Sequence, residues 1–101
     1  MATIAESAFT PTARAQMAAE PTSSNVALPT TGTPTLLRVT NLGPFDAFVL
    51  LGSSSAVAAA VATGLTVLAR TSSPFLVIGS NTYLAAITQS GGAALNLDLG
   101  N

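Results

Sequence analysis

From residue 35 onward, short apolar runs alternate with turn residues at a spacing of about ten residues. Most runs are rich in Leu, Val, Ala and Ile, and are followed by Gly, Ser, Asn or Pro, which favour turns. The runs span residues 35–40, 47–51, 56–61, 65–69, 75–78, 82–88 and 93–99. The run at 56–61 is ambiguous, because its alanines favour a helix whereas its spacing favours a strand.

The run at 93–99 shows the clearest alternation in the chain. Leu95, Leu97 and Leu99 fall on one face of an extended segment, and two polar residues fall on the other face. No helix long enough for a parallel crossover fits between the runs, so we expect antiparallel pairing. The predicted fold class is therefore all-β: a small antiparallel β-sandwich or a jelly-roll-like barrel of six to seven short strands over residues 35–101.

The first 34 residues differ from the rest in composition and pattern: they are polar, rich in Pro, Thr and Ala, and show no periodicity. We interpret residues 1–34 as an extended N-terminal arm that has room for one short helix. Thr10 would cap that helix, Pro11 suits its first position, and Pro21 would end it. The arm is either a loose tail or a segment that becomes ordered on a neighbouring subunit.

The composition leaves little material for catalysis. Only 7% of the residues are charged, and histidine and cysteine are absent, which excludes a Ser-His-Asp triad, a disulfide and a Cys-based zinc site. The four acidic residues are scattered, whereas general acid–base catalysis needs two titratable groups placed together. We therefore expect that the protein is not an enzyme and has no catalytic residue, no metal site and no cofactor.

The charge pattern also narrows the possible partners. Three arginines without a lysine, on a chain of net charge −1, form no basic patch, so we expect no nucleic-acid partner. The stretches 47–69 and 71–97 carry no charge and are long enough to cross a bilayer. However, Gly and Ser residues interrupt both stretches and basic flanks are missing, so a holin-like membrane protein is the least favoured interpretation.

The small side chains of this sequence predict a core with a thin margin of stability. Because a cysteine-free chain cannot add disulfides, association with other subunits is the remaining stabiliser. The candidate interface residues are Arg14, Arg38, Asp46, Phe48, Arg70 and Asp98.

Two of these candidates, Arg38 and Arg70, lie in or beside apolar runs. They are either outward charges that discourage pairing at a sheet edge, or partners for Asp46 or Asp98 of a neighbouring subunit. The forked guanidinium group of arginine suits such ion pairs. Phe48 is either a core residue or an anchor of the interface.

Two segments carry a resemblance to known proteins. Residues 38–52 have the pattern R-V-T-N-x-G-x-x-x-A-F-V-x-x-G, and residues 82–95 have the pattern T-x-x-A-A-I-T-x-S-G-x-A-x-L. In these patterns, and over residues 35–99 in general, the chain resembles a group of small structural proteins of tailed bacteriophages. The N-terminal part of the chain has no such match.

The resemblance implies a component of the virion, and more specifically a capsid decoration (cement) protein of the phage head, with no enzymatic residues. Its partners would be the major capsid protein and copies of itself, with a trimer preferred and a dimer compatible. An alternative from another class is a tail or fibre module that binds a receptor or a glycan, which is an analogy at the level of the fold.

Overall fold

Eight β-strands form in residues 9–101, which are the residues that the computed structural model describes, and this part of the chain contains no helix. The strands are β1 (Pro11–Ala19), β2 (Ser24–Ala27), β3 (Leu36–Pro44), β4 (Ala47–Gly52), β5 (Leu65–Val67), β6 (Leu76–Val77), β7 (Tyr83–Thr88) and β8 (Ala93–Gly100). The all-β prediction is confirmed, but the count of six to seven strands is wrong because β1 and β2 lie in the segment that we interpreted as an arm.

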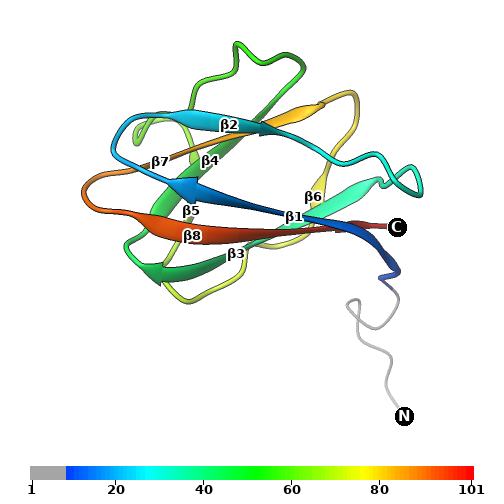
Figure 1. Ribbon diagram of the computed structural model, residues 1–101, viewed down its shortest axis with the longest axis horizontal. Coiled ribbons are helices and arrows are strands. Elements are labelled where there is room, and N and C mark those ends of the chain that lie inside the picture. Colours follow the sequence, from blue (N-terminus) through cyan, green and yellow to red (C-terminus); the bar gives the residue numbers. More distant parts are fainter. Residues whose placement is uncertain (1–8) are drawn as a thin grey trace.

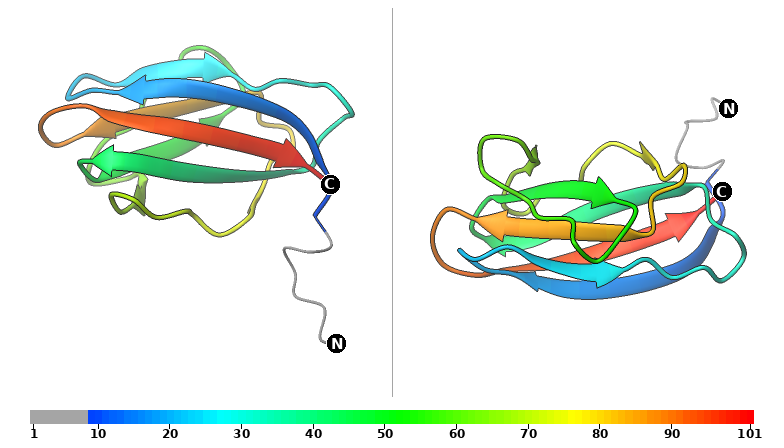
Figure 2. Two further views of the ribbon diagram at one scale, coloured as in Figure 1. Left: turned by 60° about the horizontal axis from the view of Figure 1, so that its bottom comes forward. Right: turned by 90° about the horizontal axis from the view of Figure 1, so that it is seen from above.

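The strands form two four-stranded sheets that pack as a sandwich (Figures 1 and 2). The first sheet has the order β1-β8-β3-β6 and the second has the order β2-β7-β4-β5. All strand pairs are antiparallel. The pairs are nested along the chain: the first strand pairs with the last, the second with the seventh, the third with the sixth and the fourth with the fifth.

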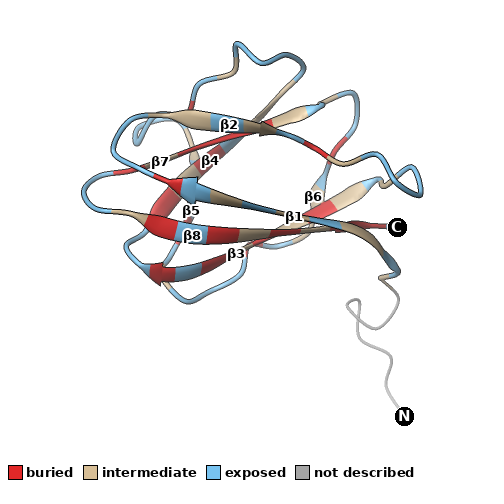
Figure 3. Cartoon of the chain, in the orientation of Figure 1, coloured by how far each residue is buried: buried red, intermediate tan, exposed pale blue. Residues whose placement is uncertain are grey.

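The core lies between the two sheets and is aliphatic. Leu95, Leu97 and Leu99 of β8 are fully buried, as their alternation predicts, and buried positions alternate with more exposed ones along β8 and β3 (Figure 3). Burying one such leucine is worth about 1.5–3 kcal/mol. From the second sheet, Val49 and Leu84 complete the centre of the core.

The helix expected after Thr10 is a strand instead. Along β1, the inward Ala15 and Met17 alternate with the exposed Arg14 and Gln16, which is the period of a strand. A helix of two or three turns would be marginal in water, whereas the strand pairs along its length with β8 and fully buries Ala19. Residues 11–27 therefore belong largely to the sandwich; residues 1–8 of the proposed arm lie outside the described residues.

The ambiguous run at 56–61 is part of an irregular loop that crosses the outer face of the second sheet (Figure 2, right). The side-chain amide of Asn25 on β2 donates a hydrogen bond to the carbonyl oxygen of Ser55 (2.8 Å), and the backbone N–H of Ala59 donates one to the hydroxyl of Ser23 (2.9 Å). Ala85 lies on this outer face, between the inward Leu84 and Ala86 in sequence, yet it is fully buried. The loop thus covers part of that face.

A buried amide fixes the connection between β3 and β4. The side chain of Asn41 is fully buried, and its nitrogen donates to the carbonyl oxygens of Phe45 (2.8 Å) and Val67 (3.0 Å). Its oxygen accepts a hydrogen bond from the backbone N–H of Gly43 (2.7 Å). One side chain therefore joins β3, the β3–β4 turn and β5.

Candidate functional site

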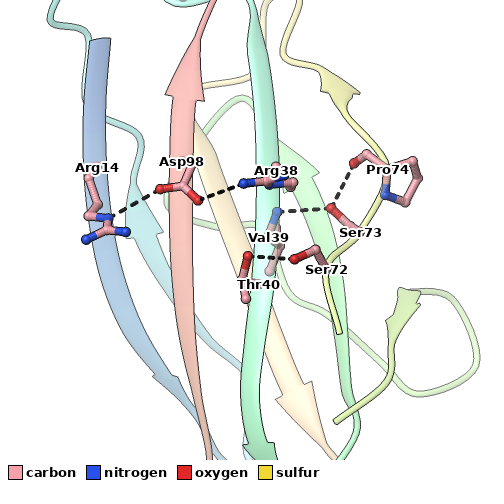
Figure 4. A network of polar contacts seen from close by, with 8 residues as sticks. All are labelled: Arg14, Arg38, Val39, Thr40, Ser72, Ser73, Pro74 and Asp98. Atoms are coloured by element: carbon pink, nitrogen blue, oxygen red, sulfur yellow. Dashed lines mark hydrogen bonds and ion pairs between the residues drawn. The ribbon is translucent and has the colours of Figure 1, made fainter. Parts of the chain in front are cut away.

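The outer face of the first sheet holds a row of three charged side chains (Figure 4). Arg14 on β1 and Arg38 on β3 both lie opposite Asp98 on the intervening strand β8. Arg14 Nε is 3.3 Å from Asp98 Oδ1, and Arg38 Nη2 is 3.8 Å from Asp98 Oδ2. The antiparallel register therefore brings together three of the six candidate interface residues, although they are far apart in the sequence.

This charged row joins residues of one chain, whereas we considered pairing of Arg38 with a neighbouring subunit. Strand β3 lies between β8 and β6, so Arg38 is on an inner strand and not at a sheet edge. The Arg14 side chain is 64% exposed, and exposed ion pairs contribute only about 0–1 kcal/mol. The row therefore adds little to the stability of the fold.

An aromatic pair lies beside the charged row. The guanidinium carbon of Arg38 is 5.4 Å from the centre of the Phe75 ring, which allows a cation–π interaction. The Phe75 ring in turn packs against Phe9, with 4.7 Å between the ring centres. These contacts connect Phe9, at the start of the described chain, to β3 and to the segment before β6.

A second polar row lies next to the charged row on the same face. The side-chain nitrogen of Gln16 donates to the side-chain oxygen of Asn96 (3.0 Å), and the hydroxyls of Thr40 and Ser72 are 2.9 Å apart. The hydroxyl oxygen of Ser73 accepts a hydrogen bond from the backbone N–H of Val39 on β3 (2.9 Å) (Figure 4). These hydrogen bonds join β1 to β8 and β3 to the segment before β6.

The other three candidate interface residues lie elsewhere. Asp46 Oδ1 accepts a hydrogen bond from the backbone N–H of Ala69 (2.8 Å), so it fixes the turn after β3. Arg70 adopts a left-handed backbone conformation with φ of 63°. Phe48 is half-buried on the outer face of the second sheet, and a Cβ added at Gly64 would lie 2.9 Å from its Cβ. The structure does not bring these three to the charged row.

Large apolar side chains are exposed over other parts of the surface. The described residues with exposed large apolar side chains are Leu42, Phe45, Leu50, Val61, Leu65, Leu68 and Val77. Five of these lie in the stretches 47–69 and 71–97, which contain no charge: Leu50, Val61, Leu65, Leu68 and Val77. In the sequence, this surface was indicated by the long uncharged stretches, which we interpreted only as possible membrane spans.

An apolar cleft opens between the two sheets where both end in very short strands. It has a volume of about 410 Å³, and its lining includes the inward Val49, Leu51 and Leu84. Leu65 of β5 and Leu76 of β6 form its two sides. A second hollow of about 300 Å³ lies at one end of the sandwich, between the loops at 28–34 and 78–82. Both hollows offer mainly aliphatic contacts.

The described residues provide little for chemistry at these places. Within residues 9–101, no three His, Cys, Asp or Glu side chains gather in a group that could hold a metal ion. The same part of the chain has no helix long and apolar enough to cross a membrane. The exposed large apolar side chains make the surfaces described above candidates for packing against another macromolecule.

Comparisons with known proteins find no relative of this chain. No protein-family model matches the chain, no curated protein matches it, and no solved structure matches it.

Proposed function

We propose that this protein is a non-enzymatic structural component of a tailed-bacteriophage virion. In this proposal it is a capsid decoration (cement) protein that binds the major capsid protein, associates with its own copies and stabilises the head shell. We also propose that the sandwich is a jelly roll. The support is the nested strand pairing, since two Greek keys of eight strands define that architecture, which is common in viral capsid proteins.

One observation carries the proposal: the surface has few charges and several exposed apolar side chains. Charged residues make up 7% of this chain, against about 25% in a typical soluble domain. Such a surface loses little hydration free energy when a partner covers it, because few charged groups have to leave water. The patterns at residues 38–52 and 82–95, which resemble phage structural proteins, supply the class of partner.

The strands β1 and β2 change the role of the N-terminal segment in this proposal. Because β1 and β2 are strands of the sandwich, attachment to the shell depends mainly on the β domain. Phe9 and Thr10 also contact the sandwich, so the segment from residue 9 onward belongs to the β domain. For the number of copies in one assembly we keep the trimer as the first proposal and the dimer as the second.

The test is the copy number of this chain in virions of the phage that encodes it. We expect quantitative mass spectrometry, calibrated on the major capsid protein, to find hundreds of copies in each particle. A handful of copies would instead favour the tail or fibre module that binds a receptor or glycan. Absence from purified virions, with the protein abundant in infected cells, would refute a structural role in the particle.

A further inference from the structure

We propose that the protein attaches to its shell through the end of the sandwich at the β3–β4 turn, where Arg70 binds a carboxylate of the partner. Three exposed apolar side chains at this end, Leu42, Phe45 and Leu68, pack against aliphatic side chains of the same partner. This inference rests on the proposed function and names the attachment surface. The partner is the shell protein, and the matching surface on it carries an Asp or Glu side chain among apolar residues.

The buried amide of Asn41 brings the three apolar residues to one end of the molecule. Asn41 donates to the carbonyl oxygens of Phe45 (2.8 Å) and Val67 (3.0 Å). Leu42 and Leu68 directly follow Asn41 and Val67 in the chain. Leu42 is 52% exposed, Phe45 42% and Leu68 55%. Exposed apolar patches mark sites of contact between proteins, so this end is a candidate for such a contact.

Hydrogen bonds hold the backbone on both sides of Arg70. The N–H of the preceding Ala69 donates to Asp46 Oδ1 (2.8 Å), and the carbonyl oxygen of the following Thr71 accepts a hydrogen bond from the N–H of Asn41 (2.8 Å). Arg70 itself has φ of 63°, a left-handed conformation that is strained for an arginine. Such strain concentrates at functional sites, so the conformation indicates a role for this side chain.

The Arg70 side chain is exposed and packed at its stem, but it has no acidic partner. A Cβ added at Gly43 would lie 3.3 Å from Arg70 Cγ and 3.4 Å from its Nε, so the glycine leaves room for the stem. Within residues 9–101 no acidic side chain pairs with Arg70, whereas Arg14 and Arg38 both pair with Asp98. A packed stem has less freedom to lose on binding, and the forked guanidinium group matches a carboxylate.

The charges of this chain favour a different protein over a second copy as the source of that carboxylate. Asp98 is already shared by two arginines, and Asp46 already accepts the N–H of Ala69. A two-fold contact at this end would also bring Arg70 close to its own copy, where the like charges repel. Glu20 is the remaining described acid, and the measurement of self-association below tests it.

The experiment measures binding of the purified full chain to purified capsids of a phage mutant that lacks this protein, by co-sedimentation. Arg70→Glu is expected to raise the dissociation constant at least about 30-fold, which is the effect of losing a hot-spot residue. Leu68→Asp should raise it about tenfold or more, because it places a charge in the apolar part of the contact. Arg14→Glu is the matched control: it makes the same change of charge at another exposed arginine, on the outer face of the first sheet, and should leave the dissociation constant unchanged.

Arg70→Gly separates attachment from folding. Glycine adopts a φ of 63° without strain, so Arg70→Gly should keep or raise the melting temperature. Capsid binding should nevertheless weaken about tenfold or more, because the guanidinium group is lost. Thermal unfolding by circular dichroism checks that every variant is folded, and analytical ultracentrifugation follows its self-association.

Three outcomes overturn the inference. Equal binding by the wild-type chain, Arg70→Glu and Leu68→Asp would place the attachment surface elsewhere, and equal losses for Arg70→Glu and Arg14→Glu would mean that only the net charge matters. Variants that lose self-association but still bind capsids would show that this end contacts a second copy. A wild-type chain that does not bind capsids at all would instead remove the proposed function, so the two failures can be told apart.

Discussion

Replacing the buried Asn41 tests how the β3–β4 connection is held. Asn41→Ala removes the side-chain partner of three backbone groups: the carbonyl oxygens of Phe45 and Val67 and the N–H of Gly43. Each buried polar group left without a partner costs about 1–3 kcal/mol. We take the low end because the site lies beside a turn, where water can enter, and this gives a loss of about 3 kcal/mol.

A loss of this size is large for a small domain, whose free energy of unfolding is about 5–15 kcal/mol. At about 4–8 °C for each kcal/mol, Asn41→Ala should lower the melting temperature by about 12–24 °C. Circular dichroism in the far ultraviolet can follow the transition, since the chain has no tryptophan for fluorescence. Asn41→Asp should destabilise at least as much, because it keeps the volume but places a carboxylate against two carbonyl oxygens.

Asn96→Ala provides the matched control for this substitution. Asn96 lies on the outer face of the first sheet, where its side chain accepts one exposed hydrogen bond from Gln16. Its removal should cost less than about 1 kcal/mol. A loss of under 4 °C for Asn41→Ala, or equal losses for Asn41→Ala and Asn96→Ala, would refute the reasoning that the buried amide fixes this connection.

Three further substitutions probe the core, the charged row and a turn. Leu97→Ala should cost about 2–5 kcal/mol in urea unfolding, because the side chain is fully buried, and a cost under 1 kcal/mol would mean that the core packs differently. A double-mutant cycle on Arg14 and Asp98 should give a coupling below about 1 kcal/mol that falls with added salt; a larger coupling, insensitive to salt, would contradict the exposed pair. Gly91→Ala should lower the melting temperature by several degrees, because Gly91 has φ of 73° and the added Cβ would overlap the ring of Phe45. The loss should be smaller when Gly91→Ala is combined with Phe45→Ala, which removes that ring.

The sequence predicted the strands whose two faces differ strongly in polarity. In β8 the large leucines 95, 97 and 99 alternate with polar residues, so the period of two was evident and the structure confirms it. In β1 both faces carry alanine: Ala15 points inward and Ala18 is exposed. Alanine favours helices and hardly distinguishes inside from outside, so the alternation of Arg14 and Gln16 was the only signal for the strand.

The candidate site depended on contacts that local patterns do not encode. The row of Arg14, Asp98 and Arg38 forms because β8 lies between β1 and β3, and the order of strands in a sheet is a property of the whole chain. The apolar cleft has the same origin, since it follows from the shortness of β5 and β6. A run of apolar residues such as 65–69 indicates a strand, but not how many of its residues find a partner.

The position of β8 has a consequence for how the protein is made. β8 fills the gap between β1 and β3, and Thr10 and Asn101 exchange two backbone hydrogen bonds (2.7 and 3.0 Å) where the ends of the described chain meet. While the polypeptide emerges from the ribosome, β1 therefore has no neighbour in its sheet until residues 93–100 are synthesised. Contacts of such long sequence separation slow folding, so the edge of β1 stays unpaired and open to other molecules until residues 93–100 have been synthesised.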